Sequence, residues 1–411
     1  FTVRGERQMS FSVSEITYLV FSVFVIAVLG FAVGRITVKG VNLGTAGVFI
    51  IALLYGILFG DKLSGELVIG DTNYITQALK IIENIGLVLF VTSVGFIAGP
   101  NFFKNLKNNF KSYVLIGVSI ILAGGATAVV CICVGRLIES GQAGFDPQEL
   151  TAIITGLLSG ALTSTPAFSA AKETVAAHYQ DAVTVGYGIA YIFGVVGVVL
   201  FVQFVPKIDH ADMAEERKKL TVIDTGETFR RKEGLIRLDP VGLAAISIAV
   251  AVGILAGSIK IFDFFSLTIT GGTLLTALVV GHFGHVGPID LMPEKHTLET
   301  CRELGLVLFL TGAGISGGMN FVKYFKAVYF IYGMAMTTIP MIAGYMLAKK
   351  CLKLGLLNNL GSITGGMTST PALGTLINVA GTDDVVSAYA ATYPVALIAV
   401  VLISQFLIIL F

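Results

Sequence analysis

Long runs of apolar residues alternate with short polar stretches along the whole chain. A helix needs about 20 mostly apolar residues to cross the hydrocarbon core of a bilayer, and most of these runs approach that length. A longer polar stretch at 206–239, rich in Lys and Arg, divides the chain into two halves. The pattern predicts six hydrophobic segments in the first half and six in the second, at 16–34, 44–60, 83–99, 112–135, 150–171, 184–205, 240–258, 267–282, 303–319, 326–348, 357–379 and 386–410.

The composition agrees with a polytopic membrane protein whose main partner is the lipid bilayer. Of the 411 residues, 55% are hydrophobic and only 13% are charged, whereas a soluble domain carries about 25% charged residues. The formal net charge is +1, and nothing in this balance indicates a nucleic-acid partner. Residues 1–9 are interpreted as an expression remnant, with Met9 as the expected natural start, and are left out of the fold prediction.

The two halves resemble each other in sequence. Corresponding positions include the identical pentapeptides at Gly86–Phe90 and Gly305–Phe309, and the tyrosine pairs Tyr187/Tyr191 and Tyr389/Tyr393. Self-similarity of this kind indicates an internal duplication. We predict a first membrane repeat at 10–205, a basic cytoplasmic linker at 206–239 and a second membrane repeat at 240–411.

The strongest similarity is a polar motif that interrupts one apolar segment of each half. Thr-Ser-Thr-Pro-Ala occurs at 163–167 and again at 368–372. Pro166 and Pro371 suit the first turn of a helix, and the Ser and Thr residues before them suit the cap position. Each motif is therefore predicted to end one helix and to begin another.

The charges of the loops indicate how these segments lie in the membrane. Lys and Arg concentrate in cytoplasmic loops. With the basic linker inside, the first half obeys this rule only if the segment at 150–171 enters and leaves on the same side. We therefore expect a re-entrant hairpin at each motif, and a crossing helix broken at the motif is the alternative. Lys323 and Lys326 would then lie outside, a mild departure from the rule.

These expectations define the fold class and a candidate site. The fold class is an all-α polytopic membrane protein with two inverted-topology repeats, each of about five transmembrane helices plus one re-entrant hairpin or broken helix. Broken helices at matching positions of inverted repeats point to the binding site of a secondary transporter, and their N-termini suit an anion. A packing motif of small residues is the alternative. The expected substrate-binding residues are Ser159, Gly160, Thr163, Ser164, Thr165, Pro166, Thr364, Gly365, Gly366, Thr368, Ser369, Thr370 and Pro371.

Further polar residues near the motifs form a second tier of candidates. Lys172 follows the first motif and would pair with a substrate carboxylate or with Glu173. The tyrosines at i and i+4 share a helix face and either pack between helices or contact the substrate; they are Tyr187, Tyr191, Tyr389 and Tyr393. Glu83, Arg302 and Glu303 open membrane segments and are interpreted as charges at loop edges.

Other chemistries are not expected. A serine nucleophile needs a base within reach, and neither motif has a His, Asp or Glu in its immediate neighbourhood. His282, His285 and His296 have no established metal-ligand spacing, so neither a metal site nor a cofactor is predicted. A channel usually has ring symmetry around a pore, and a two-fold inverted repeat favours a carrier.

The paired blocks Gly-x-x-[Ser/Thr]-Gly-[Ala/Gly]-[Leu/Met]-Thr-Ser-Thr-Pro-Ala begin at Gly156 and Gly361. Together with the Asn-Phe and Tyr-x-x-x-Tyr pairs, they resemble the aspartate–alanine exchanger family of bacterial transporters over nearly the whole chain. The resemblance implies a multi-pass carrier of the bacterial inner membrane, homodimeric, in which a hairpin-bearing domain moves as in an elevator. Members of that family usually carry a large cytoplasmic domain between the halves, where this chain has a short linker.

We therefore expect a non-enzymatic secondary active transporter that exchanges small anionic amino or carboxylic acids, in the manner of aspartate–alanine antiport. A sodium- or proton-coupled symporter of a dicarboxylate or acidic amino acid is the alternative, since backbone carbonyls at the breaks offer ligands for sodium. The first, second and sixth segments of each half are expected to form the scaffold.

Overall fold

The computed structural model describes residues 15–38, 41–42, 44–69, 72–108, 110–141, 144–220, 235–261, 265–266 and 268–411. The segment at 1–9 and residues 221–234 of the linker lie outside the described residues.

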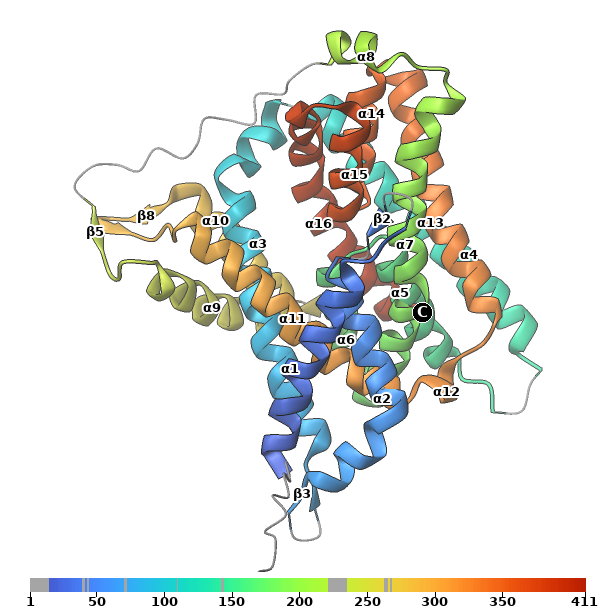
Figure 1. Cartoon of the computed structure of the whole chain (residues 1–411), viewed down its shortest axis with the longest axis vertical. Helices are drawn as coiled ribbons and strands as arrows, with labels where there is room; N and C mark the ends of the chain where they lie inside the picture. Colours follow the sequence, from blue (N-terminus) through green and yellow to red (C-terminus); the bar gives the residue numbers. More distant parts are fainter. Residues whose placement is uncertain are drawn as a thin grey trace, which may run out of the picture.

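The chain is mostly helical (Figure 1). The helices of the first half are α1 (Glu15–Gly34), α2 (Ala46–Glu66), α3 (Ile75–Asn108), α4 (Leu115–Glu139), α5 (Pro147–Ala161), α6 (Thr165–Thr174) and α7 (Gln180–Ile208). A short helix, α8 (Met213–Lys219), lies in the linker. The helices of the second half are α9 (Leu243–Gly257), α10 (Thr268–Phe283), α11 (Lys295–Met319), α12 (Phe321–Tyr324), α13 (Val328–Met346), α14 (Leu356–Gly366), α15 (Thr370–Ala380) and α16 (Val386–Leu410).

Two-residue strands occupy corresponding places in the two halves. They join the first helix to the second and the second to the third as antiparallel pairs, namely β1 (Thr37–Val38) with β2 (Val41–Asn42), β3 (Val68–Ile69) with β4 (Thr72–Asn73), β6 (Lys260–Ile261) with β7 (Phe265–Ser266), and β8 (His285–Val286) with β9 (Ile289–Asp290). A further strand, β5 (Ile236–Arg237), pairs with β9 in parallel. The order of elements in the first half therefore recurs in the second.

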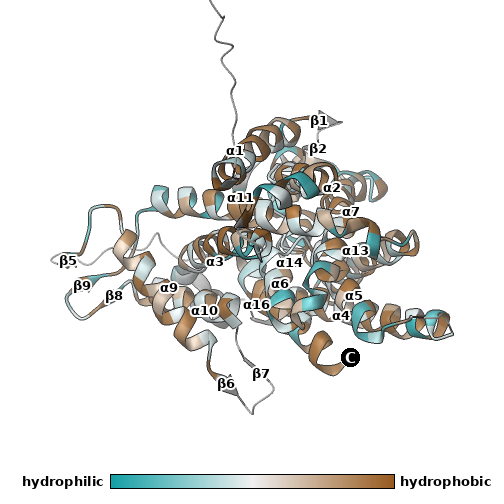
Figure 2. Ribbon diagram, turned by 90° about the horizontal axis from the view of Figure 1, so that it is seen from below, coloured by the Kyte–Doolittle hydropathy of each residue, from teal (hydrophilic) through white to brown (hydrophobic). Residues whose placement is uncertain are grey.

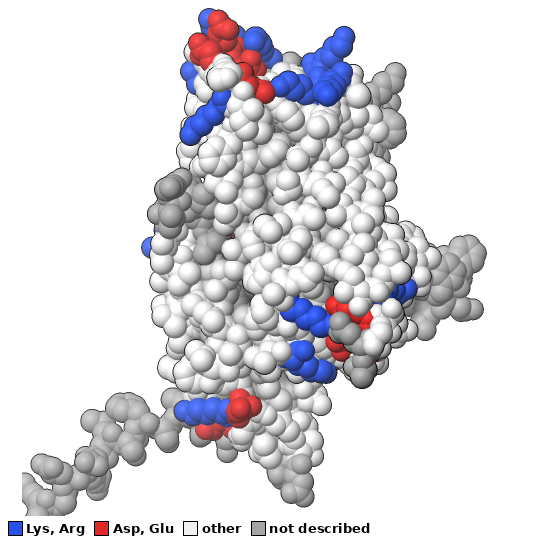
Figure 3. Space-filling model, turned by 90° about the vertical axis from the view of Figure 1, so that its right-hand side faces the viewer, with Lys and Arg blue, Asp and Glu red and all other residues white. Residues whose placement is uncertain are grey.

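The protein is an all-α polytopic membrane protein. Seven helices of the described chain are long and apolar enough to cross a membrane, namely α1, α2, α3, α4, α7, α13 and α16. Apolar residues cover most of their length (Figure 2), and side chains such as Val28, Leu58 and Leu255 are exposed, as lipid contact requires. On the face drawn in Figure 3, charged side chains gather at the end where α8 lies, and a broad band below is nearly free of charge.

The long helices pack mainly in two groups. One contains α1, α2 and α3 with α9, α10 and α11; the other contains α4 to α7 with α13 to α16. The expectation that the sixth segment lies with the first and second is wrong, because α7 packs along α5. The two backbones touch there, since a Cβ built on Gly156 would lie 2.1 Å from the carbonyl oxygen of Val183.

The identical pentapeptides of the two halves meet where α3 crosses α11. A Cβ on Gly86 would lie 2.6 Å from the carbonyl oxygen of Gly305, and a Cβ on Gly305 would lie 2.6 Å from that of Gly86. Only glycine allows backbones to approach this closely. The same short sequence therefore forms both sides of one self-complementary contact.

Each Thr-Ser-Thr-Pro-Ala motif joins two short helices that begin and end at the same end of the molecule. Asp146, the N-cap of α5, accepts a hydrogen bond from Tyr179, which lies between α6 and α7. The chain therefore returns through α6 to the end where α5 began, and α7 leads from there to α8.

The second pair of short helices lies beside α8 (Figure 1). The N–H of Leu356, at the start of α14, donates to Glu216 of α8 at 3.3 Å. Arg217 of α8 donates to the carbonyl oxygen of Ala380, at the end of α15, at 2.8 Å. The start of α14 and the end of α15 thus share one end of the molecule, opposite to the start of α5.

Lys326, which departs from the expected charge rule, lies among acidic residues. It pairs with Glu139 at 2.6 Å, and the two line a small cavity with Asp146 and Glu149. The acidic side chains therefore offset the basic charge at this end of the molecule.

Candidate functional site

Both motifs end the preceding helix with the same backbone geometry. Thr163 and Thr368 adopt left-handed φ angles of 52° and 51°. The N–H groups of Thr163 and Ser164 donate to the carbonyl oxygens of Gly160 and Ser159, both at 2.9 Å, and the equivalent bonds of the second copy measure 3.0 Å. Helix ends of this kind usually place glycine at the left-handed position. A β-branched residue is strained there, so some other interaction must hold the threonines.

That interaction joins the two motifs to each other. The hydroxyl of Thr163 donates to the carbonyl oxygen of Met367 at 3.0 Å. The hydroxyl of Thr368 donates to the carbonyl oxygen of Leu162 at 2.8 Å. Glycine would relieve the backbone strain but would remove this reciprocal pair of bonds. The first threonine of each motif therefore connects the tips of the two helix pairs.

The next residues begin the following helices, as predicted. Ser164 is the N-cap of α6, and its hydroxyl accepts a hydrogen bond from the N–H of Ala167 at 3.3 Å. Pro166 lies in the first turn. Ser369 and Pro371 hold the same positions in α15, but the Ser369 hydroxyl is buried and has no hydrogen-bond partner among the described residues.

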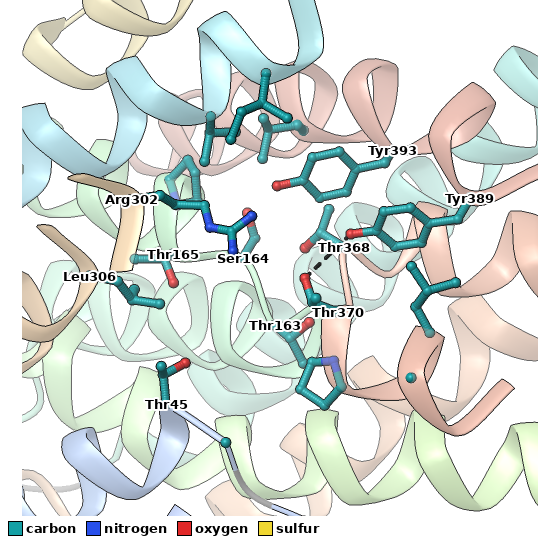
Figure 4. A pocket seen from close by; sticks show the side chains of 18 of the residues that line it. Thr45, Thr163, Ser164, Thr165, Arg302, Leu306, Thr368, Thr370, Tyr389 and Tyr393 are labelled. Carbon is teal, nitrogen blue, oxygen red and sulfur yellow. Dashed lines mark hydrogen bonds between the residues drawn. The ribbon is translucent and has the colours of Figure 1, made fainter. Parts of the chain in front are cut away.

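Both tips lie at one cavity of about 780 Å³ (Figure 4). Its walls come from α3, α7, α11, α15, α16 and the start of α2, and it extends along α15 as far as Asn378. The motif residues that line it are Thr163, Ser164, Thr165, Pro166, Thr368, Thr370 and Pro371. The structure therefore brings together the two predicted halves of the site, which lie about 200 positions apart in the sequence.

The tyrosines of α7 and α16 support the third threonine of each motif. Thr165 shares a hydrogen bond with Tyr187 at 3.3 Å, and Thr370 shares one with Tyr389 at 3.4 Å. Each of these tyrosines stacks on the tyrosine one turn later. Tyr191, Tyr389 and Tyr393 line the cavity, whereas Tyr187 is fully buried behind it.

Six of the predicted site residues are buried in helix packing rather than on the cavity wall. They are Ser159, Gly160, Thr364, Gly365, Gly366 and Ser369. The hydroxyl of Ser159 donates to the carbonyl oxygen of Thr155 at 2.9 Å. A Cβ on Gly365 would lie 2.7 Å from the carbonyl oxygen of Tyr389. These residues position the tips through close packing against α7 and α16.

Lys172 lies away from this cavity and pairs with a residue that the sequence interpretation set aside. Its Nζ is 2.7 Å from Oε1 of Glu83 on α3, and the two side chains are only 8% and 11% exposed. Glu173 instead accepts a hydrogen bond from the hydroxyl of Thr270 on α10 at 2.7 Å. A smaller cavity of about 180 Å³ lies beside these residues.

Arg302 and Glu303 are cavity residues that the sequence interpretation missed. Both line the main cavity, with 2.9 Å between Nη2 of Arg302 and Oε1 of Glu303. The interpretation as loop-edge charges is wrong, because α11 begins at Lys295 and Arg302 lies two turns inside it. The duplication offered a signal for this position: Arg302 lies three residues before Gly305, as Glu83 lies three residues before Gly86, so a charged residue occupies the same place in both halves.

Among the side chains that the structure describes, no group of three or more His, Cys, Asp or Glu residues is placed to hold a metal ion. The polar groups at the tips are instead hydroxyls and backbone groups at helix N-termini, and the Arg302 guanidinium lines the same cavity from α11. Such groups suit an organic anion.

A multi-pass helical protein whose paired short helices meet at a cavity, with hydroxyls and helix N-termini at the meeting point, belongs to the class of membrane transporters. The chain is a member of the aspartate–alanine exchanger family: residues 22–207 and 245–409 match the family model described as "Predicted Permease Membrane Region". It is similar to an uncharacterized transporter of Bacteroides thetaiotaomicron, at 26% identity over 94% of this chain and 97% of the relative. Another uncharacterized transporter, from Desulfotalea psychrophila, is 22% identical over 95% and 96%.

The chain is shorter than its alignment with one of these relatives. The alignment with the Bacteroides thetaiotaomicron protein spans 546 positions, whereas the chain has 411 residues. The relative therefore contains residues that this chain lacks. The family match leaves residues 208–244 uncovered, the region of the linker.

Proposed function

We propose that the protein is a secondary active transporter of the bacterial inner membrane that exchanges small anionic amino or carboxylic acids, in the manner of aspartate–alanine antiport. One observation carries this proposal. The tips of two helix pairs, one from each half of the chain, are hydrogen-bonded to each other at the wall of a single cavity.

The chemistry of the cavity suits a carboxylate. The N-termini of α6 and α15 lie at the tips, and a helix N-terminus carries about half a positive charge. Threonine hydroxyls and the cavity tyrosines supply donors and acceptors. A carboxylate of the substrate would bind at the tips, with Thr165 and Thr370 as direct contacts.

The proposed mechanism is alternating access by an elevator-type movement between inverted repeats. The group containing α5, α6, α14 and α15 would move against the group containing α3 and α11. Two observations support this division: the helices pack mainly within these groups, and the two motif-bearing pairs return to opposite ends of the molecule. The exposed apolar helices of the group containing α3 and α11 would face lipid or a second copy in a homodimer.

Counterflow in liposomes tests the exchange. Purified protein is reconstituted with unlabelled L-aspartate, L-alanine or succinate inside, and uptake of labelled L-aspartate is measured from outside. We expect uptake to be several-fold faster into loaded than into empty vesicles. Absence of trans-stimulation by every acid, together with a steady conductance, would identify a channel and refute the proposal.

A proton-coupled symporter is a second candidate, and one observation favours it. Glu83 and Glu173 are both held at the contact of α6 with α3 and α10, where buried carboxylates could carry a proton. Net uptake into empty vesicles, driven by an imposed proton gradient, would support symport. Obligatory exchange would instead leave empty vesicles unfilled at any proton or sodium gradient.

A further inference from the structure

Resting on the proposed function, we infer that Arg302 is the residue that selects the substrate by charge. The tips would bind one carboxylate, and the Arg302 guanidinium would bind a second. Acids with two carboxylates would therefore depend on Arg302, whereas acids with one would not.

Arg302 is placed at the cavity in a way that serves this role. It lies on α11, across from the motif tips, and Figure 4 shows its guanidinium directed into the cavity near Ser164. The charged side chains among the described residues that line the cavity are Arg302 and Glu303. A second anionic group of a bound acid therefore has one cation to approach.

The contact with Glu303 leaves Arg302 able to bind a ligand. One nitrogen, Nη2, is 2.9 Å from Oε1 of Glu303, and the side chains are 35% and 47% exposed. Ion pairs that remain accessible to solvent are weak and exchange readily. A guanidinium has five N–H donors in a planar fork, so donors remain for a carboxylate, which arginine binds in a bidentate manner.

Comparison of the two halves strengthens the assignment. Glu83 is the equivalent of Arg302, and it is neutralised by Lys172 on α6. Lys172 lies six residues after Pro166, and the residue six after Pro371 is Ile377. The second helix pair thus offers no opposite charge to Arg302 at the equivalent position. Ionisable side chains at membrane depth usually serve substrate or ion pathways, and this arginine faces the cavity that contains both tips.

The position also separates the two anion sites chemically. The tips bind through helix N-termini and hydroxyls, which any carboxylate can use. The guanidinium adds a charge-assisted contact that only a second acidic group can use. Discrimination between L-aspartate and L-alanine would therefore reside mainly on α11 rather than on the repeated motif.

The test compares wild type with Arg302→Gln, Arg302→Lys and the control Lys295→Gln. Lys295 lies on the same helix two turns earlier and is 89% exposed, so it controls for loss of one positive charge from α11. Binding is measured by ligand-induced thermal stabilisation in detergent, with L-aspartate, succinate and L-alanine as probes. The same variants are then assayed for counterflow in liposomes.

We expect Arg302→Gln to weaken binding of L-aspartate and succinate roughly 10- to 100-fold, the range for a lost hydrogen bond to a charged group. L-Alanine binding should change less than about twofold. Arg302→Lys keeps the positive charge but lacks the planar fork of donors, so its affinity for L-aspartate and succinate should lie between those of wild type and Arg302→Gln. Lys295→Gln should bind all three ligands as wild type does.

Three results would overturn the inference. One is an equal loss of affinity for all three ligands in Arg302→Gln. Another is an unchanged ratio between the affinities for dicarboxylates and for L-alanine in that variant. The third is that wild type does not bind dicarboxylates. Arg302→Lys keeps the test decisive if Arg302→Gln fails to fold. Selective binding without counterflow by wild type would refute the proposed exchange while leaving the role of Arg302 intact, so the two failures can be distinguished.

Discussion

The helix that follows each motif has the same start but very different surroundings. In α6, eight consecutive residues from Thr165 to Lys172 are buried, and the helix is tied to α3 and α10 by Lys172 and Glu173. In α15, four of the eleven residues are buried, namely Ala372, Thr375, Leu376 and Ala380. Its remaining side borders the main cavity.

The difference separates what the motif determines from what its neighbours determine. The left-handed threonines and the reciprocal bonds are the same in both copies, and a serine occupies the N-cap position in each. Exposure, in contrast, depends on whether another helix covers the copy. In a carrier with alternating access, a conformation in which α6 is covered and α15 is open would be one of two states. In the other state α6 would be open and α15 covered.

The largest expected effect is on the covered side, at the ion pair of Lys172 and Glu83. Lys172→Met would leave the Glu83 carboxylate buried without its partner, and we expect a loss of about 3–5 kcal/mol in stability. A fall in the thermal unfolding midpoint in detergent measures it. On the open side, Arg302→Gln should shift that midpoint far less, because the Arg302 side chain is 35% exposed.

The control for this prediction removes both charges. Lys172→Met combined with Glu83→Gln should recover most of the lost stability, since no buried charge then lacks a partner. A double variant as unstable as the single variant would mean that packing, and not charge, holds α6 in place.

A matched pair of cysteines tests the covered and open states directly. Ser169 and Gly374 each lie three residues after the proline of their motif. Ser169 is 2% exposed, whereas a Cβ on Gly374 meets nothing within 4 Å. Both cysteines are introduced in a background without the native cysteines and are labelled with a water-soluble maleimide. Gly374→Cys should react roughly 100-fold faster than Ser169→Cys, because the local opening that exposes a packed helix costs about 3 kcal/mol. Equal rates would show that the two copies are covered equally in solution.

The next effect should be the same in both copies, because the tips are symmetric. Thr163→Val and Thr368→Val each remove one hydroxyl of the reciprocal pair and leave a buried carbonyl oxygen unpaired. We expect each to cost about 1–3 kcal/mol in stability, measured by thermal unfolding, and Thr163→Gly to cost less because it relieves the positive φ. A clear difference between the two valine variants would show that the tips are not equivalent.

The smallest effect on stability should come from the third threonine of each motif. The hydrogen bonds of Thr165 and Thr370 to the tyrosines are long, at 3.3 and 3.4 Å. Thr165→Val and Thr370→Val should therefore cost no more than about 1 kcal/mol in stability. Counterflow should nevertheless fall about tenfold in both, because each hydroxyl would contact the substrate. Transport at the wild-type rate in both variants would exclude that role.

Much of the fold could be predicted from the sequence because its signals are local. Apolar runs marked the long helices, and Ser164 and Pro166 marked the start of α6, as Ser369 and Pro371 marked that of α15. The boundary of α11 was predicted less well. Its first turns are polar, so the apolar run begins at 303 whereas the helix begins at Lys295, and the apolar pattern therefore places Arg302 at a loop edge.

The site was predictable only in part, for a related reason. Periodicity and capping identified the two motifs, but the contact of Lys172 with Glu83 joins residues 89 positions apart. That contact depends on how α6 packs against α3, which no local pattern contains. The six predicted site residues that lie in helix packing could not be separated from the cavity residues for the same reason, since both groups consist of small residues.

The sequence by itself determined the repeated breaks and the serines and prolines that begin the helices after them, since these follow from the short-range preferences of Pro, Ser and Thr. Only the tertiary structure decided that the tips bond to each other, that Arg302 faces the cavity and that α6 is covered while α15 is open. A motif present twice has the same local preferences in both copies. The difference between the copies therefore comes from long-range packing, which places α3 and α10 against one copy and a cavity beside the other.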